Sequence, residues 1–116
     1  MDVVEILKAL GNDTRYRMVQ LLLSDNYCVR ALAVELNVSE SAVSQHLKIL
    51  REAGIVKARR KGHHIHYRVN RDVLKYAADE LMKLADMGDC SFHHTNNCSR
   101  KSGKKPGGKK EVKRKS

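Results

Sequence analysis

Apolar residues recur every three or four positions in the first part of the chain, which predicts three short helices. The first covers residues 3–10 and ends at Gly11. The second begins after Asn12 or Asp13, either of which can cap it, and ends at a turn-forming Ser-Asp-Asn sequence. The third covers residues 29–36 and is followed by a short Asn-Val-Ser turn.

A fourth helix is predicted over residues 40–53. Ser39 is a good N-cap, and Glu40 places a carboxylate at the positive end of the helix dipole. At about 100° per residue, apolar side chains fill one arc of this helix and polar side chains fill the opposite arc. The apolar arc holds Ala42, Val43, Leu47, Ile49, Leu50 and Ala53, and the polar arc holds Ser41, Ser44, Gln45, Lys48, Arg51 and Glu52. His46 falls within the apolar arc, where we expect a core-facing histidine with one satisfied hydrogen bond.

Residues 55–70 alternate apolar and polar side chains on both sides of a glycine-containing turn, which is typical of a β-hairpin. One face of its second strand holds Ile65, Tyr67 and Val69, and the other holds His64, His66 and Arg68. We expect these histidines to be polar-face residues rather than metal ligands. The hairpin tip carries Arg59, Arg60, Lys61 and His63, which suits a strand pair that lies along a phosphate backbone.

The last predicted helix begins at Asp72 and runs to about Met87. Its apolar residues span about 180°, whereas a small domain covers a stripe of about 100°. They are residues 73, 74, 77, 78, 81, 82, 84 and 85. A second copy of the chain is the best candidate to cover the excess, because most oligomers of soluble proteins are twofold dimers. A helix packed fully within its own chain is the alternative.

The order of these elements predicts a mainly α fold with a small β-hairpin: a winged helix-turn-helix. We expect a DNA-binding and dimerisation domain over residues 1–88, a Cys/His-rich segment over 89–99 and a disordered basic tail over 100–116.

The chain carries a formal net charge of +10, and the tail accounts for most of it, with nine basic residues against Glu111. Such a tail can bind phosphates non-specifically or simply keep the protein soluble. The more informative excess of positive charge lies in residues 39–64, which contain six basic residues and only two acidic ones. These residues include the fourth helix, whose Ser and Gln side chains suit base edges and whose cations suit guanine or phosphate.

Several protein classes are excluded by the sequence. No apolar run approaches the ~20 residues of a membrane span, and the start lacks a basic leader with a long apolar stretch. Three cysteines, an odd number, indicate free or metal-bound thiols, so we expect a cytoplasmic protein. No nucleophile–base pair, phosphate-binding glycine loop or paired carboxylates can be identified, so we expect no enzyme.

Three stretches carry a family resemblance: KALGNDTRYRMVQLLL, VRALAVELNVSESAVSQHLKILREAGIV and KARRKGHHIHYRV. Over roughly residues 3–88 the chain resembles the ArsR/SmtB family of metal- and stress-responsive transcriptional repressors, and the segment SAVSQHLKILREAGIV is highly specific. The resemblance implies a homodimer joined by the first and last helices, with a recognition helix at 40–53 and a wing at 55–70. It also implies repression by blocking polymerase, relieved when an inducer binds.

The leading interpretation is therefore a sequence-specific DNA-binding repressor. We expect Ser41, Ser44, Gln45 and Lys48 to face the bases. We expect Arg51, Arg59, Arg60 and Lys61 to hold phosphates, with His63 beside them. Two copies related by a dyad enter successive major grooves about 34 Å apart, so the operator is expected to be an imperfect palindrome. A non-specific architectural protein acting through its basic tail is an alternative.

The effector sites that the resemblance implies are not intact. Cys28 matches the first ligand of a Cys-x-Cys pair, but Arg30 replaces the second. A second family site on the last helix would use positions that here hold Arg71, Val73, Leu84 and Met87, none of them a plausible zinc ligand.

A different set of ligands follows the last helix. Cys90, His93, His94 and Cys98 have the spacing C-x2-H-H-x3-C, and two thiolates with two imidazoles suit Zn²⁺ or a similar thiophilic ion. No metal is expected to be required for the fold. Three alternatives stay open: arsenite bound by three thiolates with Cys28 included, a reversible Cys90–Cys98 disulfide in a thiol-redox-responsive repressor, and a segment without a role.

Overall fold

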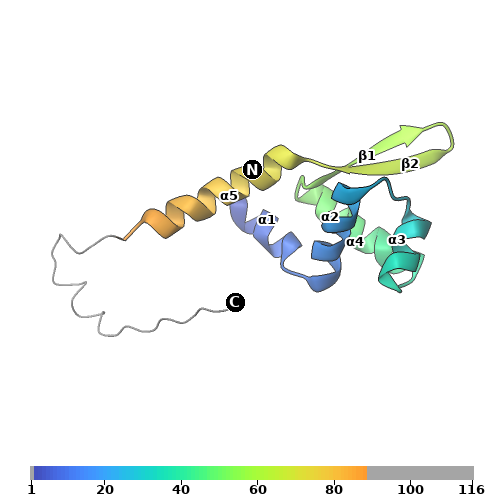
Figure 1. The fold of residues 1–116 in the computed structure, drawn as a ribbon, viewed down its shortest axis with the longest axis horizontal. Helices are drawn as coiled ribbons and strands as arrows, with labels where there is room; N and C mark the ends of the chain where they lie inside the picture. Colours follow the sequence, from blue (N-terminus) through green and yellow to red (C-terminus); the bar gives the residue numbers. More distant parts are fainter. Residues whose placement is uncertain (1, 89–116) are drawn as a thin grey trace. The chain divides into compact units, whose positions relative to one another are not determined.

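The computed structural model describes residues 2–88, which contain five helices and one antiparallel hairpin in the predicted order (Figure 1). The elements are α1 (Val3–Leu10), α2 (Asp13–Ser24), α3 (Val29–Leu36), α4 (Glu40–Glu52), β1 (Val56–Lys61), β2 (His64–Val69) and α5 (Arg71–Asp86). The chain divides into two compact units, Met1–Leu81 and Met82–Ser116, so the division falls inside α5. The predicted winged helix-turn-helix is confirmed.

Side-chain caps determine where α2 and α4 begin. Asn12 Oδ1 accepts a hydrogen bond from the backbone N–H of Arg15 at 3.0 Å, which makes Asn12, not Asp13, the N-cap of α2. Ser39 Oγ accepts from the backbone N–H of Ala42 at 3.0 Å, as predicted. Each bond satisfies a backbone donor that a helix start otherwise leaves without a partner.

One apolar core holds the unit of residues 2–81 together. Its largest fully buried side chains come from all five helices and from the residue before β1, namely Ile6, Met18, Leu32, Val43, Leu47, Leu50, Ile55 and Val73. No polar or charged residue among the described residues is buried. The core therefore derives its stability from apolar burial, and it fixes α4 with its apolar arc inward.

The last helix contributes only its first half to this core. Val73 and Ala77 are buried, whereas Leu81 is 45% exposed. Within the second unit, Met82 is 60% exposed and Leu84 is 63% exposed. Much of the predicted apolar band of α5 is thus uncovered in the single chain.

Among the described residues, no helix is both long enough and apolar enough to cross a membrane.

Candidate nucleic-acid interface

A tight turn joins α3 to α4 and sets the angle between the two helices. Asn37 adopts the left-handed conformation at φ 58°, which Asn tolerates better than most residues, and its backbone N–H bonds the carbonyls of Ala33 and Val34. α3 then packs against α4. An ion pair of 3.8 Å joins Arg30 Nε to Glu40 Oε2 across this junction, but both side chains are well exposed, so it adds little stability.

The two arcs predicted for α4 are observed. Val43, Leu47 and Leu50 are buried in the core. The polar arc is exposed along its whole length, and its members are Ser41, Ser44, Gln45, Lys48, Arg51 and Glu52. Ile49 differs from the prediction because it is 39% exposed and lines a shallow recess beside α1. The exposed arc presents hydroxyls, an amide and two cations, the donor and acceptor groups that read base edges and contact phosphates.

His46 lies behind this polar arc and is half-buried. Its Nδ1 lies 3.2 Å from Nη1 of Arg15, so the expected single hydrogen-bond partner is present. Burial, and secondarily the positive charge of Arg15, lower the pKa of His46 from its ordinary value of 6.5. The imidazole is therefore neutral at pH 7. Separately, no group of three or more His, Cys, Asp or Glu residues in the described range is placed to bind a metal.

The register of the hairpin determines which wing residues share a face. Gly62, at φ 61°, and His63 form the two-residue turn between the strands. Three cross-strand pairs then lie on one face: Lys57–Arg68, Arg59–His66 and Lys61–His64. Every one of these six residues is a cation or a histidine. We call this set the basic wing face.

The predicted phosphate contacts do not all lie on the basic wing face. Arg59 and Lys61 belong to it, but Arg60 pairs with Ile65 on the opposite face and His63 is in the turn. All four side chains are exposed. The sequence assignment omitted Lys57 and Arg68, both exposed cations of the basic wing face. Alternation counted across a two-residue turn would have identified them.

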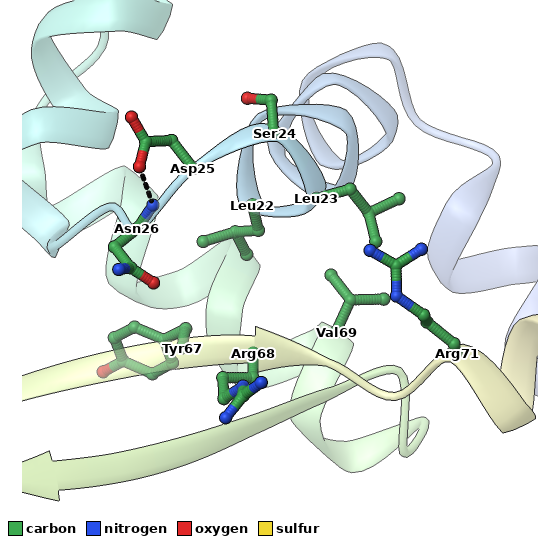
Figure 2. A pocket seen from close by; sticks show the side chains of 9 residues that line it. All are labelled: Leu22, Leu23, Ser24, Asp25, Asn26, Tyr67, Arg68, Val69 and Arg71. Atoms are coloured by element: carbon green, nitrogen blue, oxygen red, sulfur yellow. Dashed lines mark hydrogen bonds between the residues drawn. The ribbon is translucent and has the colours of Figure 1, made fainter.

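A small pocket marks where the wing meets the body of the domain (Figure 2). Leu22 and Leu23, in the last turn of α2, line it with Tyr67 and Val69 of β2. Its cavity volume of about 230 Å³ is below the range typical of small-molecule sites, and Arg68 of the basic wing face also lines it. The apolar face of β2 packs against the core and contacts α2, which leaves the basic wing face largely exposed.

Of the predicted metal ligands, Cys28 alone lies among the described residues. It is exposed, and it precedes α3 without forming a side-chain cap. The predicted ligands Cys90, His93, His94 and Cys98 lie outside the described residues, as does the basic tail.

An exposed polar recognition helix after a tight turn, followed by a basic hairpin, defines a winged helix-turn-helix DNA-binding protein. The family model "Bacterial regulatory protein, arsR family" matches residues 12–58. The chain is 36% identical to the Arsenic resistance transcriptional regulator ArsR1 of Pseudomonas putida, over 72% of this chain and 78% of that protein. It is 30% identical to the Transcriptional repressor SdpR of Bacillus subtilis, over 72% of this chain and 93% of that protein.

A solved structure is also similar to this chain. The homodimeric winged helix-turn-helix domain of a possible ArsR-family regulator from Mycobacterium bovis matches with a TM-score of 0.59 and 29% identity, over 80% of this chain and 87% of that one. The chain belongs to the ArsR family. The predicted DNA-binding transcriptional repressor of the ArsR type is confirmed over the alternative functions, and the similar proteins are regulators of transcription.

Proposed function

We propose that the protein represses transcription as a homodimer bound to a palindromic operator. The observation that carries this proposal is the polar arc of α4, which is exposed throughout while the opposite arc is buried. In the complex, α4 lies in the major groove, where Ser41, Ser44, Gln45 and Lys48 face base edges. Arg51, next along the same arc, contacts a phosphate at the groove edge.

The wing contacts the adjacent phosphates in this arrangement. Arg59 and Lys61 do so from the basic wing face, together with Lys57 and Arg68. Arg60 and His63 contact phosphates from the opposite face and from the turn. Cations on both faces and at the tip suit a hairpin that lies in a groove, with one phosphate backbone on each side of it.

Exposed apolar residues on α1, on α5 and directly after α5 support the homodimer. Val4 of α1 is 54% exposed, and Leu84 and Met87, at the end of the chain's described part, are 63% and 68% exposed. Apolar side chains at such positions gain free energy when a second copy covers them. The homodimeric state of the similar Mycobacterium bovis domain is consistent with this proposal.

The test of this proposal is selection of duplexes from a random library by the full-length protein. We expect enrichment of an imperfect palindrome whose half-sites are one helical turn apart, bound by two copies of the chain. A variant that lacks residues 100–116 should select the same sequence. If removing the tail abolishes binding, or if no sequence is enriched, the proposal is wrong.

We further propose that a thiophilic metal or metalloid ion relieves repression. The candidate ligands are Cys90, His93, His94 and Cys98, with Cys28 as a third thiolate for arsenite. The similarity to a regulator named for arsenic resistance supports this class of effector. Arg30 occupies the second position of the family's Cys-x-Cys pair, and a guanidinium has no lone pair to offer a metal ion, so ligands other than that pair are needed.

Substitution of single cysteines distinguishes the possible effectors. Zinc affinity and release of the selected duplex should both fall in Cys90→Ser and Cys98→Ser, while Cys28→Ser retains them if zinc is the effector. Loss of the arsenite response in all three variants indicates a trithiolate site instead. Release by an oxidant that depends only on Cys90 and Cys98 indicates a disulfide switch. Unchanged zinc affinity and arsenite response in every variant would refute the proposed site.

A further inference from the structure

The end of α1, the start of α2 and the middle of α4 are joined by one side chain. Arg15 Nε donates a hydrogen bond to the backbone carbonyl of Ala9 at 2.6 Å, and Arg15 Nη1 lies 3.2 Å from His46 Nδ1. Ala9 is in the last turn of α1, where helix carbonyls lack partners within the helix. Both Arg15 and His46 are half-buried.

Building on the proposed operator binding, we infer that Arg15 and His46 are a positioning pair that holds the recognition helix in its DNA-binding orientation, and that protonation of His46 releases it. The pair does not touch DNA in this account. It acts through Gln45, which precedes His46, and Lys48, two residues after His46; both lie on the exposed arc of α4. Base readout depends on such placement to within about half an ångström.

The chemistry of the pair allows only one protonation state of the imidazole. A guanidinium has donors but no acceptor, and it keeps its charge at all accessible pH values. His46 Nδ1 must therefore be the acceptor, with the ring proton on Nε2. A doubly protonated ring has no acceptor to offer, and it would place a second positive charge 3.2 Å from the first. The hydrogen bond is then replaced by repulsion between two cations.

The surroundings of the pair favour the neutral ring. Burial and the charge of Arg15 both lower the pKa of His46, so the pair is intact at pH 7. Other charged groups come from each element packed against α4. Glu5 and Lys8 of α1 and Glu52 of α4 line the recess that includes Arg15. A second recess is lined by Lys57 of β1 together with Lys48 and Arg51 of α4. The charged residues of α3 are Glu35 and Arg30, and Arg30 pairs with Glu40.

The expected effect on sequence preference separates this pair from the cations of the wing. Positive charge near the phosphates strengthens binding to any duplex, whatever its sequence. Protonation of His46 instead disturbs the base-reading helix, which weakens binding to the selected duplex relative to a random one. Acidification should therefore reduce sequence preference even where it raises non-specific affinity.

The first experiment measures affinity of the full-length protein for the selected and random duplexes at pH 7.5 and 5.5, at constant ionic strength. We expect the preference of the wild type for the selected duplex to fall about tenfold, as loss of one charge-assisted hydrogen bond predicts. His46→Asn places an amide oxygen near the position of Nδ1 and does not titrate, so its preference should not change with pH. His46→Leu should have a low preference at both pH values.

A double His64→Gln, His66→Gln control should keep the acid-induced loss of preference. Circular dichroism at pH 5.5 shows that folded protein is being compared. A preference that is independent of pH in the wild type, or that falls equally in His46→Asn, would overturn the inference.

The second experiment needs no DNA, so it separates failure of the pair from failure of operator binding. ¹⁵N chemical shifts of the His46 ring should report the Nε2–H tautomer at pH 7.5 and a pKa below 6.5, and Arg15→Gln should raise that pKa. A ring that is charged at pH 7, or that carries its proton on Nδ1, would disprove the pair. Failure to select any sequence, with these shifts as expected, would refute operator binding alone.

Discussion

Lys57 of β1 and Arg68 of β2 are direct partners across the wing, so two cations stand opposite each other on an exposed face. The next two pairs on that face, Arg59–His66 and Lys61–His64, add further positive charge. Like charges directly opposite each other destabilise a strand pair. The wing therefore gives up stability to concentrate charge, and the phosphate contacts proposed for this face would relieve the repulsion.

Removing one member of the Lys57–Arg68 pair should stabilise the protein and weaken its binding to DNA. We expect Arg68→Thr to raise the free energy of unfolding by about 0.5 kcal/mol, because the change removes the repulsion from Lys57 and because threonine has a good strand propensity. Affinity should fall equally for selected and random duplexes, and the slope of log affinity against log salt should decrease in magnitude by about one. Urea unfolding and a salt titration measure the two effects. Arg68→Lys, the matched control, should change neither by much; a stability loss in Arg68→Thr contradicts the argument.

Unlike Arg68→Thr, substitutions on the exposed arc of α4 should weaken binding to the selected duplex more than binding to random DNA. Gln45→Ala and Lys48→Ala should each cost about 1–3 kcal/mol in binding to the selected duplex and much less in binding to random DNA. Lys61→Ala, on the wing, should weaken both and flatten the salt dependence. Fluorescence anisotropy with the two duplexes makes the comparison. Equal losses on both duplexes for Gln45→Ala would mean that this residue does not read bases.

The elements and the two arcs of α4 could be predicted because periodicity and caps are local properties of the sequence. Ser39 and Glu40 mark the start of α4, and the spacing of Val43, Leu47 and Leu50 fixes its buried side. What decides each of these features lies within a few residues along the chain.

The remaining features depend on contacts between distant residues. Arg15 and His46 are 31 positions apart, and nothing in either local pattern indicates that they meet. The basic wing face, by contrast, could have been predicted in full once the turn was counted as two residues, because that turn sets the pairing register and places Arg60 opposite Ile65. A shift of one residue would reverse these faces.

The N-cap of α4, Ser39, should contribute measurably to the stability of the fold. Ser39→Ala removes the hydroxyl that accepts from the Ala42 N–H, and it should lower the free energy of unfolding by about 1 kcal/mol. Ser41→Ala, two residues further on and exposed, should change stability by less than about 0.5 kcal/mol. Urea unfolding of the two variants provides the test. Equal effects would show that the cap does not stabilise α4.

Charge on the exposed apolar residues of α5 should break the proposed dimer without unfolding the chain. Leu84 is 63% exposed, so Leu84→Glu loses little burial within its own chain but would place a carboxylate in an apolar interface. Sedimentation equilibrium should show a shift from dimer to monomer, and affinity for the palindrome should fall. Lys75→Gln, an exposed change on the same helix, is the control. A Leu84→Glu protein that remains dimeric would exclude this part of α5 from the interface.

The depressed pKa of His46 also makes folding stability depend on pH. Burial and Arg15 hold this pKa below its ordinary value of 6.5 in the folded chain, so the unfolded chain binds a proton more readily. The stabilisation is complete above pH 6.5 and is lost as the pH falls through the window between 6.5 and the lower folded pKa. We expect the free energy of unfolding to decrease on acidification through this window, and the decrease to be smaller in His46→Asn, which has no titrating ring. Urea unfolding at half-unit pH intervals measures the difference between the two proteins. Identical pH dependence in both would mean that protonation of His46 costs the folded state nothing.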